Sequence, residues 1–180
     1  DVVINVAGIA HIKETDENRD IYYEINRDLS VNIAKNAKEA RVKQYILLSS
    51  MSVYGLVTGH ITKDTVPHPI NAYGDSKLQA DNIIRNMEGD SFKVAIVRPP
   101  MVYGKGCKGN YQTLRKFAVK SPVFPDCKNE RSMIYIGNLC EFMKCVIDRE
   151  DFGLFFPQNR EYVRTSDMVR TVARQHNKTI

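Results

Sequence analysis

Tyr73 and Lys77 are the side chains of this sequence whose types and spacing best suit chemistry. A separation of four residues places both on one face of a helix, one turn apart. A free phenol has a pKa near ~10 and is a poor base at neutral pH. A neighbouring ammonium favours the phenolate and lowers that pKa. The pair therefore predicts a tyrosine base that a lysine assists.

A serine pair upstream supplies a third group. Ser49 and Ser50 follow the apolar run 45–48, which is typical of a strand, so their hydroxyls lie where a strand opens into a loop. A Y-x-x-x-K spacing alone is weak, because any amphipathic helix can carry it. Here it follows Val-Tyr-Gly and a long polar loop over 56–71, and long ordered loops are commonly functional. Together these groups indicate hydride chemistry on a sugar-sized alcohol.

Composition limits the class of protein. The chain has 180 residues, enough for one domain with a sizeable core, and 43% hydrophobic with 26% charged residues is ordinary for a soluble globular protein. Its apolar runs are shorter than the ~18–20 residues of a membrane span, and its first residues resemble a strand rather than a signal peptide. No membrane partner is expected.

Charge and cysteine usage narrow the partners. The net charge is +5, but the basic residues are spread among acidic ones. The sequence has no run of basic residues with interleaved aromatic residues, so nucleic acid is not expected as a partner. The basic segment 105–110 is either a solvated loop or an attractor of an anion such as a nucleotide diphosphate. The four cysteines form no C-x-x-C pair, so we expect reduced structural thiols, a cytoplasmic location and no metal site.

The pattern of apolar segments predicts an α/β fold with a parallel sheet and flanking helices. The expected strands cover 2–6, 45–49 and 93–98, and the expected helices cover 19–40 and 73–87. In the first helix, apolar residues at four-residue steps mark the expected buried face: Ile21, Ile25, Leu29, Ile33 and Ala37.

Shorter elements follow Pro100. We expect a helix over 111–119, a strand over 132–136, and a last short strand over 152–156. Asn138 and Glu141 have the spacing of a capping box that begins one helix, and Ser166 is expected to cap another. These elements predict a smaller C-terminal lobe.

Four segments resemble the extended short-chain dehydrogenase/reductase family, in its NAD-dependent nucleotide-sugar epimerase/dehydratase branch (UDP-glucose 4-epimerase-like). They are 5–11, the segment 49–55 (family S-S-x-x-V-Y-G), the segment 71–77 (family Y-G-x-S-K), and 98–104 (family R-P-x-x-V-Y-G) with 131–136 (family R-x-x-I-x-V). The resemblance implies a Rossmann-like NAD(P)-binding domain over 1–100. It also implies a mixed substrate-binding region over 101–180, with a return of the chain to the sheet left open.

The resemblance implies catalytic roles for Ser50, Tyr73 and Lys77. Tyr73 would be the base, Lys77 would hold the nicotinamide ribose and lower the phenol pKa, and Ser50 would hydrogen-bond the reacting sugar hydroxyl. Asn26 would support the site; the alternative for Asn26 is a plain solvated helix position. The cofactor is expected to be NAD, with NADP left open.

Other residues are implied to bind ligands. Ala7 and Gly8 would allow close approach of the cofactor. Tyr73, Lys77 and Pro100 are also implied to be cofactor-binding residues. Asn110 and Arg131 match positions that contact the nucleotide diphosphate of a nucleotide-sugar substrate, with a UDP-sugar expected. The alternative for Arg131 is a surface ion pair with an acid such as Glu130.

The sequence departs from the family at three points. It has no G-x-x-G-x-x-G segment, so we expect a fragment of a longer enzyme that lacks its first strands. Met101 and Asn138 stand where relatives often have asparagine and aspartate, which leaves the sugar open. Met51-Ser52 replace the Asp-Glu pair of dehydratases, which makes dehydration the weaker alternative.

The expected reaction is 4-epimerisation of a UDP-sugar by transient oxidation at C4. One alternative is an NAD(P)H-dependent reductase of a nucleotide 4-keto-6-deoxy sugar. A second is a non-catalytic, cofactor-sensing or scaffold protein of the same fold. Family members often dimerise through two helices, which here would be those near 19–40 and 73–88.

Overall fold

The computed structural model describes residues 1–10, 12–107 and 110–180, without the side chain of Asn110. The chain divides into two compact units. The first contains Asp1–Pro99 and Phe142–Phe156, and the second contains Pro100–Glu141 and Pro157–Ile180.

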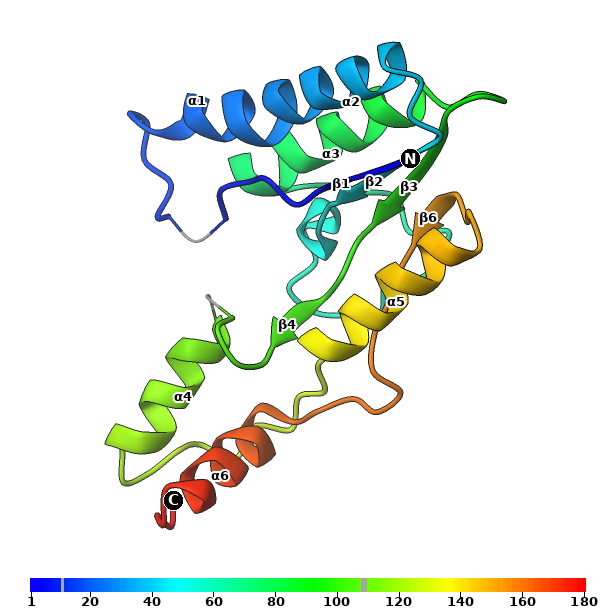
Figure 1. Cartoon of the computed structure of the whole chain (residues 1–180). Coiled ribbons are helices and arrows are strands. Elements are labelled where there is room, and N and C mark those ends of the chain that lie inside the picture. The colour runs from blue at the N-terminus through cyan, green and yellow to red at the C-terminus, as the bar shows by residue number, and fades with distance from the viewer. Residues whose placement is uncertain (11, 108–109) are drawn as a thin grey trace. The chain divides into compact units, whose positions relative to one another are not determined.

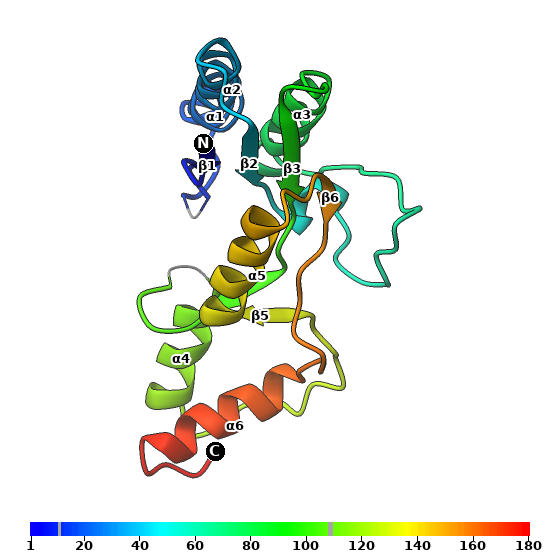
Figure 2. The same cartoon turned by 45° about the vertical axis from the view of Figure 1, so that its right-hand side comes forward.

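The first unit is built on a four-stranded parallel sheet of order β1-β2-β3-β6 (Figures 1 and 2). Its strands are β1 (Val2–Asn5), β2 (Gln44–Leu48), β3 (Lys93–Val97) and β6 (Gly153–Phe155). Tyr45 lies opposite Val3 on one side and Val94 on the other. Because all four strands are parallel, the segments that follow them emerge at one edge. The predicted parallel α/β sheet is confirmed.

Helices flank this sheet (Figure 1). The first is continuous through α1 (Arg19–Tyr22), the π-helical segment η1 (Tyr23–Leu29) and α2 (Ser30–Glu39). It packs beside α3 (Ala72–Arg85), while the short 3₁₀ helix η2 (Met51–Tyr54) follows β2. The core between helices and strands contains mainly aliphatic and aromatic side chains: Val31, Ala34, Ala37, Tyr45, Leu47, Ala80, Ile84, Phe92, Val94 and Ile96.

The buried face of the first helix agrees with the predicted one at Ile33 and Ala37, which pack in the core, but differs nearer the start of the helix. Ile21 and Leu29 are 44% and 39% exposed, whereas Tyr22, Asn26 and Ser30 are buried. Two of these polar side chains are hydrogen-bonded: the Tyr22 hydroxyl donates to the carbonyl of Ile12 at 2.6 Å, and Asn26 bonds to both backbone groups of Ile9. The buried Ser30 hydroxyl has no hydrogen-bond partner among the described residues. An apolar pattern cannot reveal a face that is buried through hydrogen bonds.

The second unit has a two-stranded parallel sheet of β4 (Met101–Tyr103) and β5 (Met133–Tyr135). The helices α4 (Asn110–Lys120) and α6 (Thr165–Gln175) pack together around Ala118, Val169, Val172 and Ala173. Helix α5 (Ile136–Asp148) begins in this unit and continues in the first one.

Two predicted helix caps are wrong. Helix α5 begins at Ile136, so Asn138 lies inside it and donates to Asn159 Oδ1 at 2.9 Å. Helix α6 begins at Thr165, and the Ser166 hydroxyl donates to the carbonyl of Cys127 at 3.3 Å instead of capping. Both polar side chains have tertiary partners, which the local pattern could not show.

Among the helices of the described ranges, none combines the length and the apolar character that a bilayer span requires.

Candidate active site

The segment after β2 places the two serines. The Ser49 amide donates to the carbonyl of Val97 at 2.7 Å, which extends the ladder between β2 and β3. Ser50 is extended and caps η2, with its hydroxyl accepting from the Ser52 amide at 3.1 Å. Gly55 ends this turn at φ 63°, a left-handed conformation that a side chain at this position would strain. The Ser50 hydroxyl is thereby held at the carboxyl edge of the sheet.

The start of α3 is held against this turn. Asn71 caps the helix by accepting from the Gly74 amide at 2.8 Å, and Glu14 Oε2 accepts from the Ala72 amide at 2.9 Å. A Cβ atom on Gly74 would lie 2.5 Å from the carbonyl oxygen of Ser52. Glycine at this position therefore allows the close approach of α3 to the turn that carries Ser50, whose hydroxyl lowers the pKa of the Tyr73 phenol.

Lys77 lies one turn further along α3 and is 4% exposed. Its ammonium donates to the carbonyl of Leu48, the last residue of β2, at 3.1 Å. A Cβ atom on Gly8 would lie 3.0 Å from Lys77 Nζ and 2.9 Å from Asn26 Oδ1. The segment after β1 thus passes directly over the lysine, and the first unit brings Gly8, Ser50, Tyr73 and Lys77 to one edge of its sheet.

Burial dominates the electrostatics of this group. Burial raises the pKa of the Tyr73 phenol, while the Ser50 hydrogen bond lowers it. Burial also lowers the pKa of Lys77, and the charge of Asp81 opposes that change. The net pKa of Tyr73 is therefore raised rather than lowered, because desolvation penalises the charged form of the phenol. The predicted lowering of that pKa by Lys77 stays a prediction.

Asn26 holds the segment after β1 in place. It is fully buried, its Oδ1 accepts from the Ile9 amide at 2.9 Å, and its Nδ2 donates to the Ile9 carbonyl and to Ser76 Oγ, both at 3.1 Å. It lies in the π-helical segment η1, and π-bulges occur frequently at functional sites. The alternative of a solvated helix position is wrong.

Replacing Asn26 with alanine should destabilise the protein by ~1–3 kcal/mol, because both backbone groups of Ile9 would lose their partner. Urea unfolding measures this change. Asn36→Ala is the matched control, since Asn36 is exposed on the same helix and should change stability by less than ~0.5 kcal/mol. Equal stability of the two variants would contradict the role of Asn26.

The segment after β1 also carries the predicted cofactor residues Ala7 and Gly8. The Ala7 amide donates to Asn5 Oδ1 at 2.9 Å, and Asn5 Nδ2 donates to the Tyr45 hydroxyl at 2.8 Å. Ala7 is partly buried and Gly8 is exposed, so the glycine backbone is open to a ligand.

A buried ion pair beside Lys77 was missed by the sequence analysis. Arg98 Nε donates to Asp81 Oδ2 at 2.9 Å, and the two side chains are 2% and 0% exposed. The sequence contains one clue to each residue: Asp81 lies four residues after Lys77, and Arg98 directly follows β3. Neither clue shows that Asp81 and Arg98 pair with each other, because seventeen positions separate them in the chain.

Three predicted ligand residues lie in the second unit. Pro100 is half-buried, and Arg131 is exposed with its backbone paired to Val163 at 2.9 and 3.0 Å. Arg131 makes no ion pair with Glu130 or another acid in the part of the chain that the structure describes, so that alternative is not supported. The side chain of Asn110 lies outside the described residues, and its role stays a prediction.

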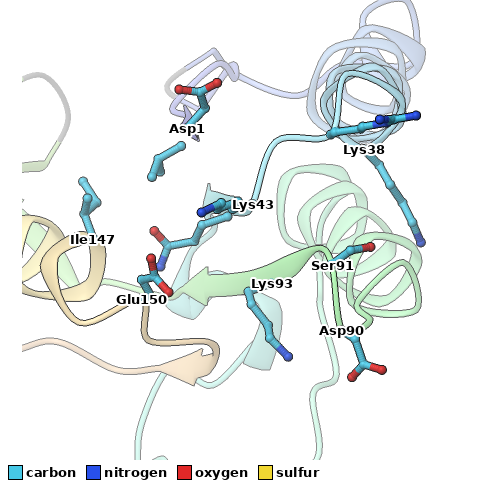
Figure 3. A pocket seen from close by; sticks show the side chains of 11 residues that line it. Asp1, Lys38, Lys43, Asp90, Ser91, Lys93, Ile147 and Glu150 are labelled. Carbon is cyan, nitrogen blue, oxygen red and sulfur yellow. The ribbon is translucent and has the colours of Figure 1, made fainter.

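A cavity of about 590 Å³ lies in the first unit, away from these residues (Figure 3). Its lining includes Asp1, Lys43 and Lys93, which stand where β1, β2 and β3 begin, whereas Ser50, Tyr73 and Lys77 lie where strands end. Lys38, also in the lining, donates to the carbonyl of Met87 at 2.6 Å. This cavity is therefore not the place of the predicted chemistry.

A family model described as the NAD dependent epimerase/dehydratase family matches residues 1–155. The chain belongs to this family. It is 32% identical over 183 residues to a UDP-glucose 4-epimerase of Vibrio cholerae, covering 96% of this chain and 56% of that protein. An N-acetyl-alpha-D-glucosaminyl-diphospho-ditrans,octacis-undecaprenol 4-epimerase of Escherichia coli O157:H7 is 35% identical over 130 residues, covering 69% of this chain and 39% of the relative.

Solved structures share the fold of this family member. A UDP-glucuronic acid 4-epimerase from Bacillus cereus in complex with NAD superposes with a TM-score of 0.86 at 21% identity, over 99% of this chain and 60% of that one. A dTDP-4-dehydrorhamnose reductase from Clostridium acetobutylicum gives 0.82 at 23% identity, over 98% and 62%. This chain thus spans about three fifths of the length of these two proteins, 56% of the Vibrio cholerae relative and 39% of the Escherichia coli relative. The predicted family and Rossmann-like fold are confirmed.

Proposed function

We propose that this chain provides the catalytic residues of a UDP-sugar 4-epimerase that uses NAD. The observation that carries the proposal is the group formed by Ser50, Tyr73 and Lys77 at the carboxyl edge of the parallel sheet. The similarity to a UDP-glucose 4-epimerase over 96% of the chain supports it.

The residues around Gly8 suit a dinucleotide. A side chain on Gly8 would collide with Asn26 and crowd the Lys77 ammonium, so glycine lets this segment pass directly over the lysine. Gly8 is exposed, which leaves its backbone open to a ligand. Lys77 could donate to ribose hydroxyls with the protons that its bond to Leu48 leaves unused. Ala7, Gly8, Tyr73, Lys77 and Pro100 would line the cofactor. When bound, NAD supplies the acceptor and later the donor of the C4 hydride.

Tyr73 would remove the proton from the C4 hydroxyl. The Ser50 hydroxyl, which acts on the phenol by lowering its pKa, would steady the sugar oxygen or relay the proton. Lys77 and Ser50 would favour the phenolate against the cost of burial. The same phenol would return the proton after the 4-keto sugar has presented its opposite face.

The substrate residues proposed for the second unit are Asn110 and Arg131. Arginine suits a diphosphate because its planar guanidinium donates two parallel hydrogen bonds. The exposed position of Arg131 leaves its guanidinium accessible for that contact.

The second candidate is a reductase of a nucleotide 4-keto-6-deoxy sugar, which would use the same three residues. The fold shared with a dTDP-4-dehydrorhamnose reductase is the observation that favours this second candidate. A non-catalytic protein is the weaker choice, because Ser50, Tyr73 and Lys77 are all present and grouped.

The full-length protein, incubated with UDP-glucose and NAD without a reductant, tests the proposal. We expect UDP-galactose to appear by NMR with no net change in NADH absorbance. Consumption of one NAD(P)H per 4-keto-6-deoxy sugar, without epimerisation of UDP-sugars, would establish the reductase instead.

Two further properties belong to the proposal. The four free cysteines are compatible with the reducing cytoplasm. A homodimer would use the helices near 19–40 and 73–88, whose exposed Ile21, Leu29 and Ile83 offer apolar contacts.

A further inference from the structure

Asp81 is a fully buried carboxylate that the proposed reaction does not use. It lies on α3 one turn after Lys77 and two turns after Tyr73, so the three side chains form a row along one face of the helix. Isolated buried carboxylates are costly, and their presence calls for a reason.

The two partners of Asp81 come from two different segments. Its Oδ2 accepts from the Ser49 hydroxyl at 2.8 Å and from Arg98 Nε at 2.9 Å. Arg98 in turn donates to the Tyr54 hydroxyl at 2.8 Å. The carboxylate therefore joins α3 to the residues that follow β2 and β3 and to η2, which Ser50 caps.

The second oxygen of the carboxylate is different. Among the described residues, Oδ1 of Asp81 has no hydrogen-bond partner although it is buried. A group that served only to connect segments would be expected to satisfy both oxygens. In the low dielectric of the interior, the charge acts over a longer range than at the surface. The buried Lys77 ammonium lies one turn away on the same face of α3, so this charge acts on it. The charge of Asp81 correspondingly opposes the effect of burial on the pKa of Lys77.

We propose that Asp81 is the positioning residue of this site: its carboxylate, held by Ser49 and Arg98, sets a negative charge one helical turn from the buried Lys77 ammonium and so orients that ammonium for the site. The consequence for catalysis rests on the proposed function, whereas the electrostatic effect of Asp81 on Lys77 is independent of that function.

The titratable groups around Asp81 are Lys77 and Tyr73 on α3, Arg98 after β3, Tyr54 in η2 and, beside Tyr73, Tyr22 of α1. Removing the charge of Asp81 leaves burial unopposed at Lys77, so the pKa of Lys77 should fall. The pKa of Tyr73 should fall too, because the charge of Asp81 raises it. Local unfolding would have the opposite effect on Lys77, whose pKa would rise toward the free value of ~10.4.

The test is an NMR titration of the Lys77 and Tyr73 side chains in Asp81→Asn, with the signals assigned through Lys77→Arg and Tyr73→Phe. We expect the pKa of Lys77 to fall by ~1–3 pH units, the size of a close charge–charge effect. Asp75→Asn is the matched control: it removes the same charge from the same helix, but Asp75 bonds to Tyr23 and Gln79 and is not among the groups that shift Lys77. It should leave the Lys77 titration unchanged.

Asp81→Asn leaves Arg98 buried without its counter-charge, so Asp81→Asn/Arg98→Met, which removes both charges, is the second variant. A pKa of Lys77 that stays constant or rises in a folded variant overturns the proposal. Failure of both variants to fold also overturns the proposal, since the main role of Asp81 would then be to stabilise the fold.

The full-length enzyme separates this proposal from the proposed function. There, Asp81→Asn should lower kcat while the KM for the nucleotide sugar stays within about twofold of wild type, since Asp81 does not contact substrate. If wild type shows no epimerase activity while the titration shift is present, the proposed function fails and the positioning role stands.

Discussion

Tyr73→Phe in the full-length protein is expected to lower kcat for UDP-sugar epimerisation by ~10²–10⁴-fold, the range that a positioned acid–base group contributes. The substitution removes the phenol hydroxyl and leaves the ring, which packs edge-to-face with Tyr22 at a centroid distance of 6.5 Å. The fold should therefore be retained. Initial rates of UDP-galactose formation at saturating substrate measure the effect.

Tyr23→Phe is the matched control for this substitution. Tyr23 lies on the neighbouring helix, and its hydroxyl donates to Asp75 Oδ2 at 2.9 Å. It loses the same oxygen atom but takes no part in the proposed reaction, so kcat should stay within about twofold of wild type. Near-normal epimerisation by Tyr73→Phe would remove the base from the mechanism.

Arg98→Met is expected to destabilise the chain by ~3–5 kcal/mol, because it leaves the Asp81 carboxylate buried without a cation. Arg98 is among the largest fully buried side chains, and it also loses its bond to the Tyr54 hydroxyl. Burial already raises the pKa of Asp81, and Arg98 opposes that effect. Urea unfolding at neutral pH measures the loss.

Arg27→Met serves as the control for Arg98→Met. Arg27 also forms an ion pair, with Asp28 at 2.7 Å, but both side chains are partly exposed. Its loss should cost less than ~1 kcal/mol. The double change Asp81→Asn/Arg98→Met should recover much of the stability that Arg98→Met loses, since no unpaired charge stays buried. Equal losses of unfolding free energy in Arg98→Met and Arg27→Met would show that burial of the Asp81–Arg98 pair does not affect stability.

Much of the fold follows from local pattern. Strands β1, β2 and β3 lie within about a residue of the predicted bounds. Strand β3 ends at Val97, and Pro99-Pro100 follow it after Arg98. Period-2 and period-3.6 patterns are visible in a single segment, so they need no knowledge of the rest of the chain. The caps predicted at Asn138 and Ser166 failed because tertiary partners compete for those side chains.

The candidate site divides in the same way. The grouping of Tyr73 with Lys77 was predictable, because helical geometry alone sets which residues share a face. The role of Gly74 was not, since it depends on the carbonyl of Ser52 reaching the helix from another segment. The ties from Asn26 to Ile9 and from Asp81 to Arg98 were equally hidden, because each joins residues seventeen positions apart.

By itself, the sequence determined the order of strands and helices, the family, and the residues that could act as base, lysine partner and hydroxyl donor. Only the tertiary structure decided that Asn26 and Asp81 are buried, and that Tyr73 has a raised rather than a lowered pKa. The physical reason is that periodicity is a local property of the chain. Desolvation and hydrogen-bond satisfaction depend on which distant segments the fold brings together.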